Sequence, residues 1–143
     1  MRDCDFDLID DLFCKLVDKK EEHGWRFLTA EELVLVLVWH ASGIIGNGGF
    51  QYFFEQELDA EATACAYETI GCDKCAELLR LSLSLFSRSI LQANWKERIQ
   101  FVEDNKEMFD NLSSAFWEAD KQMRGKLAGY ARNHKAVILS SNI

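Results

Sequence analysis

Two cysteines stand three residues apart, at Cys72 and Cys75, and this C-x-x-C spacing suits redox chemistry or metal binding. A redox pair of this kind normally follows a strand in an alternating strand–helix pattern, which this chain lacks. A zinc site takes four ligands, typically from two such pairs, and only Cys65 lies near in sequence. The three cysteines occupy small-residue positions near Ala64, Ala66 and Ala76, as buried thiols often do. The pattern favours packing and leaves redox or metal work as the alternative.

The histidines His23, His40 and His134 are the other candidates for acid–base chemistry. His40 lies in a strongly apolar segment and could pair with a cysteine or a carboxylate, although a buried histidine satisfied by one hydrogen bond is commoner. No GxGxxG, GxxxxGK[ST], HExxH or GxSxG motif occurs in the chain. The sequence therefore favours a protein that is not an enzyme, and we expect no metal and no cofactor.

A glycine-rich motif lies between two apolar segments and reads Asn47-Gly48-Gly49-Phe50-Gln51-Tyr52-Phe53. Asparagine and glycine tolerate left-handed dihedrals, so we expect a sharp corner with Gln51 and Tyr52 facing solvent. Free N–H groups at a helix start can bind an anion, but no lysine or arginine adjoins this one. The commoner alternative is that Asn47 caps a short helix by accepting a bond from the Phe50 N–H. A further alternative is a small ligand-binding or catalytic pocket at the corner, using His40, Gln51 or Tyr52.

Acidic side chains gather in the first half of the chain. The net charge is −8, with −10 in residues 1–80 and +2 in residues 81–143. Within an expected first helix, a line of carboxylates lies opposite the apolar stripe: Asp3, Asp7, Asp11 and Asp18. Such a line is usually a solvated face, but it could also bind a basic protein partner. Direct nucleic-acid binding is disfavoured, because neutralising phosphates requires a basic surface.

Periodicity and the absence of proline predict an all-α fold, a single compact domain over residues 1–143 with about seven or eight helices. A capping box, Thr29-Ala30-Glu31-Glu32, starts the second and most apolar helix, which we expect to end at Gly46. An aromatic helix follows from about Gly48 to Glu57. We expect later helices to be capped by Asp59 and Asn94, a looser connection over 87–94, and a carboxyl-terminal helix bent at Gly125 or Gly129.

The amino-terminal sequence and the length of the apolar segments indicate where in the cell the protein is located. The amino terminus is acidic rather than basic, and the apolar run Leu33 to Trp39 is shorter than the 20 or so residues that span a bilayer. We therefore expect a cytoplasmic protein with reduced thiols and no membrane association.

The motif Asn47-Gly48-Gly49-Phe50-Gln51-Tyr52-Phe53 resembles the signature of a bacterial domain-of-unknown-function family that includes a DNA-mimic protein. The likeness continues through Ala66–Gly71, Ala76–Leu79, Phe109–Trp117 and Leu127–His134, so it covers roughly residues 28–135. The resemblance implies a compact all-α fold. One member of that family presents acidic side chains in place of DNA phosphates and blocks the DNA-binding surface of a transcription factor. The resemblance therefore implies that this chain could act in a similar way. Cys72 and Cys75 replace alanine-like residues of that family.

These observations give three functional hypotheses. The first is a non-enzymatic acidic interaction protein, in the manner of a DNA mimic, that binds a basic partner such as a DNA-binding regulator. The second is a small ligand-binding or enzymatic helical domain with a pocket near the Asn47–Gly49 corner. The third is an immunity or antitoxin-like protein with the same acidic surface. A homodimer is also compatible with the high aromatic and leucine content.

Overall fold

Every regular element in residues 3–139, the part that the computed structural model describes, is helical. In chain order the elements are α1 Cys4–His23, η1 Trp25–Phe27, α2 Ala30–Glu55, α3 Ala60–Thr69, α4 Asp73–Ser84, α5 Arg88–Leu91, α6 Trp95–Asp104, α7 Lys106–Ala119, η2 Asp120–Gln122 and α8 Met123–Asn133. The predicted all-α class, with about seven or eight helices, is thereby confirmed.

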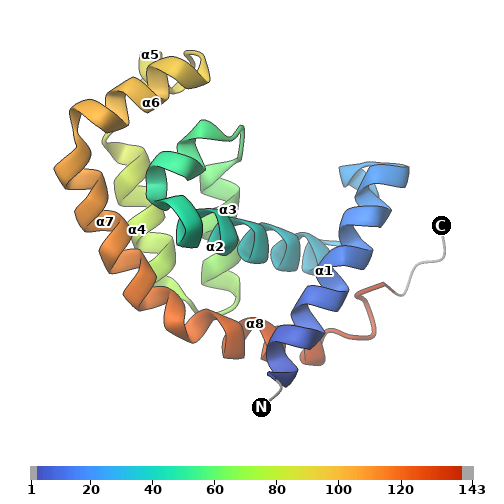
Figure 1. Ribbon diagram of the computed structural model, residues 1–143. Coiled ribbons are helices and arrows are strands. Elements are labelled where there is room, and N and C mark those ends of the chain that lie inside the picture. The colour runs from blue at the N-terminus through green and yellow to red at the C-terminus, as the bar shows by residue number, and fades with distance from the viewer. Residues whose placement is uncertain (1–2, 140–143) are drawn as a thin grey trace.

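Helix α2 is the axis around which the other helices pack. It runs from the end of the molecule formed by α1 and α8 to the end near α5 and α6 (Figure 1). Its side chains are apolar in every direction, which is why α1, α3, α6, α7 and α8 can all bury part of it. The shared core includes Val38, Ile45 and Phe50, which are fully buried.

The apolar character of α2 extends well past the run Leu33–Trp39. Among the described helices, α2 is the one long and apolar enough to cross a bilayer by length and composition. Half of that apolar window is buried by the other helices, and α2 occupies the centre of the bundle (Figure 1). Its position is therefore that of a core helix.

The predicted helix starts are confirmed by side-chain caps. The Glu32 N–H donates to Thr29 Oγ1 at 3.1 Å while the Thr29 N–H donates to Glu32 Oε1 at 2.8 Å, which completes the capping box. Asp59 and Asn94 accept bonds from the first turns of α3 and α6 in the same manner. Local sequence therefore determines where these helices begin.

Two predicted bends lie elsewhere in the structure. Helix α2 does not end at Gly46, because it continues with helical geometry until Gly49, where φ is 67° and ψ is −168°. Gly125 and Gly129 both lie inside α8, and the short helix η2 separates α7 from α8. Residues 87–94 are not wholly irregular, because they contain the single turn of α5.

Helix α1 is joined to the bundle by a buried ion pair. Lys19 Nζ lies 2.9 Å from Glu32 Oε1, and both side chains are buried. Glu32 Oε2 also accepts a bond from the Leu139 N–H at 2.6 Å, so one carboxylate connects α1, α2 and the segment after α8. Burial alone would raise the pKa of Glu32, but these hydrogen bonds and that from Thr29 hold it below its ordinary value.

Candidate functional site

The glycine motif forms a kink inside α2. Gly49 adopts backbone dihedrals that are open almost only to glycine, and a Cβ built on it would lie 2.9 Å from Ser113 Oγ on α7. Two glycine properties are therefore needed at once: the positive φ and the absence of a side chain. Gly48 is constrained as well, because a Cβ built on it would lie 2.6 Å from Tyr52 Cβ, but the positive φ belongs to Gly49.

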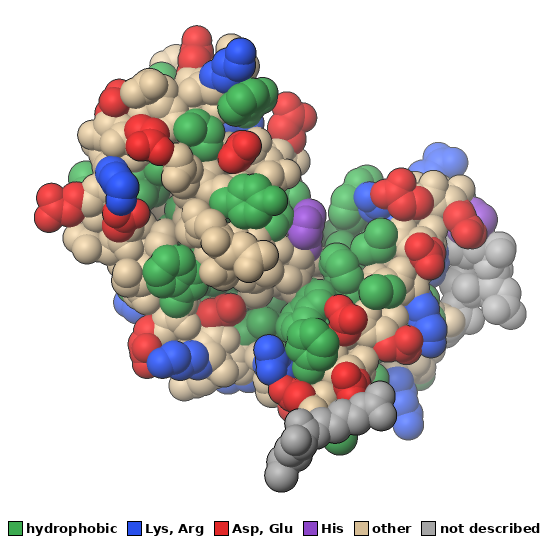
Figure 2. All heavy atoms as spheres, viewed as in Figure 1, with side chains coloured by type: hydrophobic (Ala, Val, Ile, Leu, Met, Phe, Trp, Pro, Cys, Tyr) green, Lys and Arg blue, Asp and Glu red, His purple; other side chains and the backbone are tan. Residues whose placement is uncertain are grey.

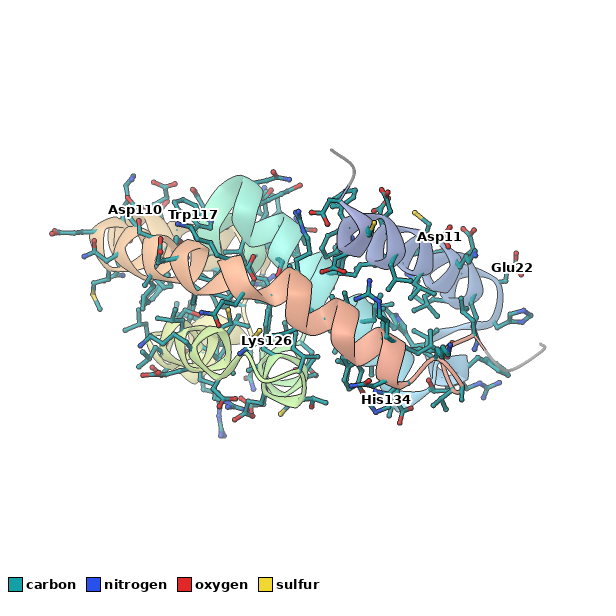
Figure 3. The ribbon with its side chains drawn as sticks, turned by 90° about the horizontal axis from the view of Figure 1, so that it is seen from below. Asp11, Glu22, Asp110, Trp117, Lys126 and His134 are labelled. Atoms are coloured by element: carbon teal, nitrogen blue, oxygen red, sulfur yellow. The ribbon has the colours of Figure 1, made fainter. Side chains whose placement is uncertain are left out.

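Helix α7 supplies the polar partners that the kink requires. The Phe50 N–H donates to Ser113 Oγ at 3.0 Å, and Trp117 Nε1 donates to the Ile45 carbonyl at 2.7 Å. Figure 3 shows Trp117 on α7 beside α2. The expectation that Asn47 would accept the Phe50 N–H is therefore wrong, since Asn47 is an exposed residue within the helix.

The aromatic side chains after the kink fill the space around it. Phe50 and Phe53 are buried, and the Phe50 ring meets Phe116 of α7 edge-on at 5.6 Å between centroids. The cavity left beside Gly48 and Gly49 holds only about 70 Å³. Small-molecule sites typically occupy about 300–1,000 Å³, so this corner offers no room for an ordinary ligand.

The residues suggested for a pocket at this corner are not brought together. His40 is exposed and lies beside Phe13 of α1, with 6.3 Å between ring centroids. Gln51 is exposed as predicted and its amide donates to Glu103 of α6. Tyr52 is also exposed, as predicted. The corner therefore holds α2, α6 and α7 together rather than assembling a catalytic group.

A buried polar chain that sequence reasoning missed crosses the core. Ser42 hydrogen-bonds to the Tyr67 hydroxyl and donates to Asp120 Oδ1 at 2.9 Å. Burial raises the pKa of Asp120, although the bond from Ser42 opposes this, and burial raises that of Tyr67 strongly. Since these three side chains come from α2, α3 and η2, the chain of bonds links those elements; no histidine is part of it.

Two of the four carboxylates in the acidic line on α1 are paired with cations. Asp3 caps α1 and contacts Arg124, while Asp11 lies 2.9 Å from Lys15. Asp7 is partly exposed and also has interaction partners, and Asp18 is exposed. Asp11 lies on the outer side of α1 (Figure 3). The four carboxylates are thus on the surface as predicted, but at least two of them already face a cation.

A second acidic surface lies at the opposite end of α2. Its residues are Glu55, Glu57, Asp59 and Glu61, which we call the α2–α3 edge, and all four are exposed. Glu61 pairs with Arg80 at 3.0 Å, whereas Glu55 and Glu57 form no ion pair with any residue in 3–139. Figure 2 shows acidic side chains at this end of the molecule as well as over α1.

A sequence signal for this edge was available. Between Arg26 and Lys74 the chain has no lysine or arginine, yet it carries these carboxylates: Glu31, Glu32, Glu55, Glu57, Asp59, Glu61, Glu68 and Asp73. The net charge of residues 1–80 does not reveal this stretch, because it averages over the lysines and arginines on either side. Its exposed carboxylates can be neutralised only by distant residues or by a partner.

A hollow of about 490 Å³ lies beneath the α2–α3 edge. Its wall combines the carboxylates of Glu57 and Asp59 with the apolar side chains of Leu58 and Leu91. The one cation in it, Arg98, donates to the Phe54 carbonyl at 3.0 Å and the Ala93 carbonyl at 2.7 Å, so its guanidinium contacts backbone rather than the carboxylates. Such a hollow suits a long basic side chain, whose stem is apolar and whose head is charged.

The described part of the chain contains no group of three or more His, Cys, Asp or Glu side chains placed to hold a metal ion. Cys65 is exposed on α3, while Cys72 and Cys75 are buried at the start of α4. The three thiols suggested as a metal set are therefore not assembled as one.

Comparison with known proteins supports a family and gives no closer relative. No curated protein and no solved structure matches the chain. A model of the family described as DMP19-like protein matches residues 26–134, which begin just after α1 and include the kink, the α2–α3 edge and α8. This range agrees with the resemblance over residues 28–135, and it supports a DNA-mimic-like domain family. The chain belongs to the DMP19-like protein family.

Proposed function

We propose that this protein is a non-enzymatic interaction protein whose α2–α3 edge binds a basic, DNA-binding protein in the place of DNA. The observation that carries the proposal is the pair Glu55 and Glu57, two exposed carboxylates without a cation among residues 3–139, beside a hollow lined in part by apolar side chains. The DNA-mimic-like family supports the kind of partner.

Charge complementarity explains how the edge would recognise such a partner. A DNA-binding surface is rich in lysine and arginine, and carboxylates at the rim of an interface accelerate association and select for opposite charge. A lysine or arginine side chain entering the hollow could lay its stem on Leu58 and Leu91 and its head near Glu57. The proposal includes a cytoplasmic location, in keeping with five unpaired cysteines.

The test begins with capture of partners on the immobilised protein at low and high salt, followed by identification of those that salt releases. A captured protein is then mixed with its fluorescently labelled DNA duplex, and DNA release is followed by anisotropy as this protein is added. We expect competition that weakens as the Debye length shortens toward about 8 Å at physiological ionic strength.

Two outcomes would contradict the proposal. One is that no salt-sensitive basic partner is captured. The other is a ternary complex in which partner, DNA and this protein coexist, because that would place the contact away from the DNA-binding surface. The expected homodimer remains a prediction, and light scattering on the same sample measures it.

A further inference from the structure

The turn between α3 and α4 places two of the five cysteines at the start of a helix. Gly71, with φ of 86°, turns the chain after α3, and Cys72 then serves as the N-cap residue of α4. Cys75 lies in the first turn of α4. The two residues are 5% and 1% exposed, and both line a hollow of about 620 Å³ between α4 and the α7–α8 segment.

The two thiols are coupled and differ in character. Interaction between the two neighbouring thiols lowers the pKa of Cys72 and raises that of Cys75. Burial raises the pKa of both thiols, and so does the Asp120 carboxylate. The balance leaves the pKa of Cys72 below its ordinary value and that of Cys75 far above it.

A cation from another helix faces the same pair. Lys126 of α8 points toward the α3–α4 turn (Figure 3), and its ammonium donates to the Gly71 carbonyl at 2.6 Å. Its charge also lowers the pKa of Cys72. Cys72 makes no side-chain cap bond, and the first N–H groups of a helix have no partner within the helix. Both the ammonium and the helix start can therefore stabilise a thiolate at Cys72.

We propose that Cys72 and Cys75 form a reversible dithiol–disulfide site whose substrate is a small disulfide of the glutathione class. Three observations carry it: one cysteine at the N-cap and the other in the first turn of the same helix, a lysine from α8 that donates to the adjacent Gly71 carbonyl, and a hollow that both cysteines and this lysine line. The site is separate from the α2–α3 edge, and the proposal does not depend on the proposed function.

The exchange takes place in two balanced steps. The Cys72 thiolate attacks one sulfur of the small disulfide, forms a mixed disulfide and releases one small thiolate. The Cys75 thiol then loses its proton to that thiolate, and its sulfur attacks Cys72 and releases the second small thiolate. This thiolate takes up the proton that Cys72 lost to solvent when its own thiolate formed. Two protein thiols are oxidised to one disulfide, while one small disulfide is reduced to two thiols.

The fold allows the ring to close with little rearrangement. Neighbouring helical residues three apart have Cβ atoms about 5–6 Å apart, whereas a disulfide needs about 3.5–4.5 Å. Cys72 is outside the regular helix, with φ −95° and ψ 63°, so its backbone can move without unwinding α4. Two backbone hydrogen bonds of Cys72 are directly affected: its carbonyl accepts from the Ala76 N–H at 3.2 Å, and its N–H donates to the Tyr67 carbonyl at 2.8 Å.

The test uses the full chain with Cys4, Cys14 and Cys65 changed to serine, because these three thiols are exposed and would react on their own. The protein is equilibrated with mixtures of reduced and oxidised glutathione, alkylated, and analysed by mass spectrometry. We expect loss of two hydrogens within the peptide that carries Cys72 and Cys75, with a single midpoint potential. Far-ultraviolet circular dichroism confirms that the chain stays folded.

Single variants in this background separate the two roles. Cys75→Ser should stop at a mixed disulfide, with one glutathione on Cys72, whereas Cys72→Ser should react about tenfold more slowly with oxidised glutathione. Lys126→Gln should slow the reaction of Cys72 about threefold, and the exposed Lys96→Gln on α6 serves as the matched control with no change.

The proposal is overturned if both thiols remain reduced in excess oxidised glutathione while the chain stays folded. It is also overturned if a glutathione adduct forms on Cys72 without an internal disulfide. Should the serine background fail to fold, peptide mapping of the oxidised natural sequence makes the same measurement, because the disulfide links two residues within one short segment.

Discussion

The two acidic surfaces of this molecule differ less in their number of carboxylates than in what faces them. At the start of α1, Asp3 contacts Arg124 and Asp5 lies 2.8 Å from Arg132, so helix α8 supplies cations for two of these carboxylates. At the α2–α3 edge, Glu55 and Glu57 have no such cation within residues 3–139. A carboxylate that is already paired inside its own chain has less to gain from a partner.

This difference shows why net charge is a poor guide to a binding surface. Exposed ion pairs contribute little to stability, but they do remove the local potential that attracts a basic partner. The α2–α3 edge combines two carboxylates that lack a cation, Glu55 and Glu57, with a hollow lined in part by apolar side chains, and it falls within the family match at residues 26–134. Helix α1 falls outside that match.

The largest expected effect is at the junction that holds α1 in place. Glu32→Ala should destabilise the fold by about 3–5 kcal/mol, because it leaves the buried Lys19 ammonium without its counter-charge. Urea unfolding measures this loss. Glu31→Ala, on the partly exposed side of the same turn, is the matched control and should stay within about 0.5 kcal/mol. Equal losses from the two variants would contradict the role of the pair.

The same junction has a defined pH dependence. Because the pKa of folded Glu32 lies below the ordinary value of 4.5, its contribution is fully present above that pH and lost as pH falls through the folded pKa. Glu32→Gln should therefore flatten the acid limb of the stability curve in this range. An unchanged acid limb would show that other carboxylates dominate.

The second expected effect concerns the kink that positions the α2–α3 edge. Gly49→Ala should cost at least about 1–3 kcal/mol, since alanine is strained at a φ of 67° and its Cβ would approach Ser113 Oγ at 2.9 Å. Gly125→Ala in α8, where a Cβ meets nothing within 4 Å, should instead stabilise the helix by about 0.5–1 kcal/mol. Thermal melting compares the two, and a melting temperature unchanged in Gly49→Ala would contradict the requirement for glycine.

Local features of this fold could be predicted from sequence, and long-range ones could not. Thr29, Asp59 and Asn94 cap helices through bonds to residues three positions away, so their patterns are visible in short segments. The site of the kink depends on Ser113, which is 63 positions from Phe50. Because this partner is far away in sequence, the glycine pattern alone predicts the end of the helix at Gly46 instead of a kink at Gly49. The fold places Ser113 of α7 beside the kink, and no short sequence pattern around Gly49 predicts this contact.

The candidate site follows the same division. The cation-free stretch between Arg26 and Lys74 is a property of the sequence and could have located the α2–α3 edge directly. The pairing of Asp3 and Asp5 with α8 could not be predicted, because Arg124 and Arg132 are 121 and 127 positions from the aspartates that they contact. A run of acidic residues in the sequence therefore locates an unpaired acidic surface only where no lysine or arginine from a distant part of the chain pairs with it.

The difference between the α2–α3 edge and the acidic line on α1 is tested most directly by two variants that change the net charge by the same amount. The double variant Glu55→Gln/Glu57→Gln should weaken binding of the captured basic partner about tenfold, chiefly through slower association and a shallower salt dependence. The variant Asp7→Asn/Asp11→Asn on α1 should change affinity less than about twofold. Surface plasmon resonance at two salt concentrations measures both. If the α1 variant has the larger effect, the binding surface lies on α1 and the assignment of the edge is wrong.

The smallest expected effect separates charge from structure within the edge itself. Asp59 both caps α3, through a 2.9 Å bond to the Ala62 N–H, and contributes a carboxylate to the surface. Asp59→Asn removes the charge and keeps a capping side chain, so stability should change by only a few tenths of a kcal/mol, whereas Asp59→Ala should lose about 1 kcal/mol. Both variants remove one charge, so both should weaken partner binding to the same extent, about twofold to threefold. If only Asp59→Ala weakened binding, the geometry of the α3 start, and not its charge, would be what the partner recognises.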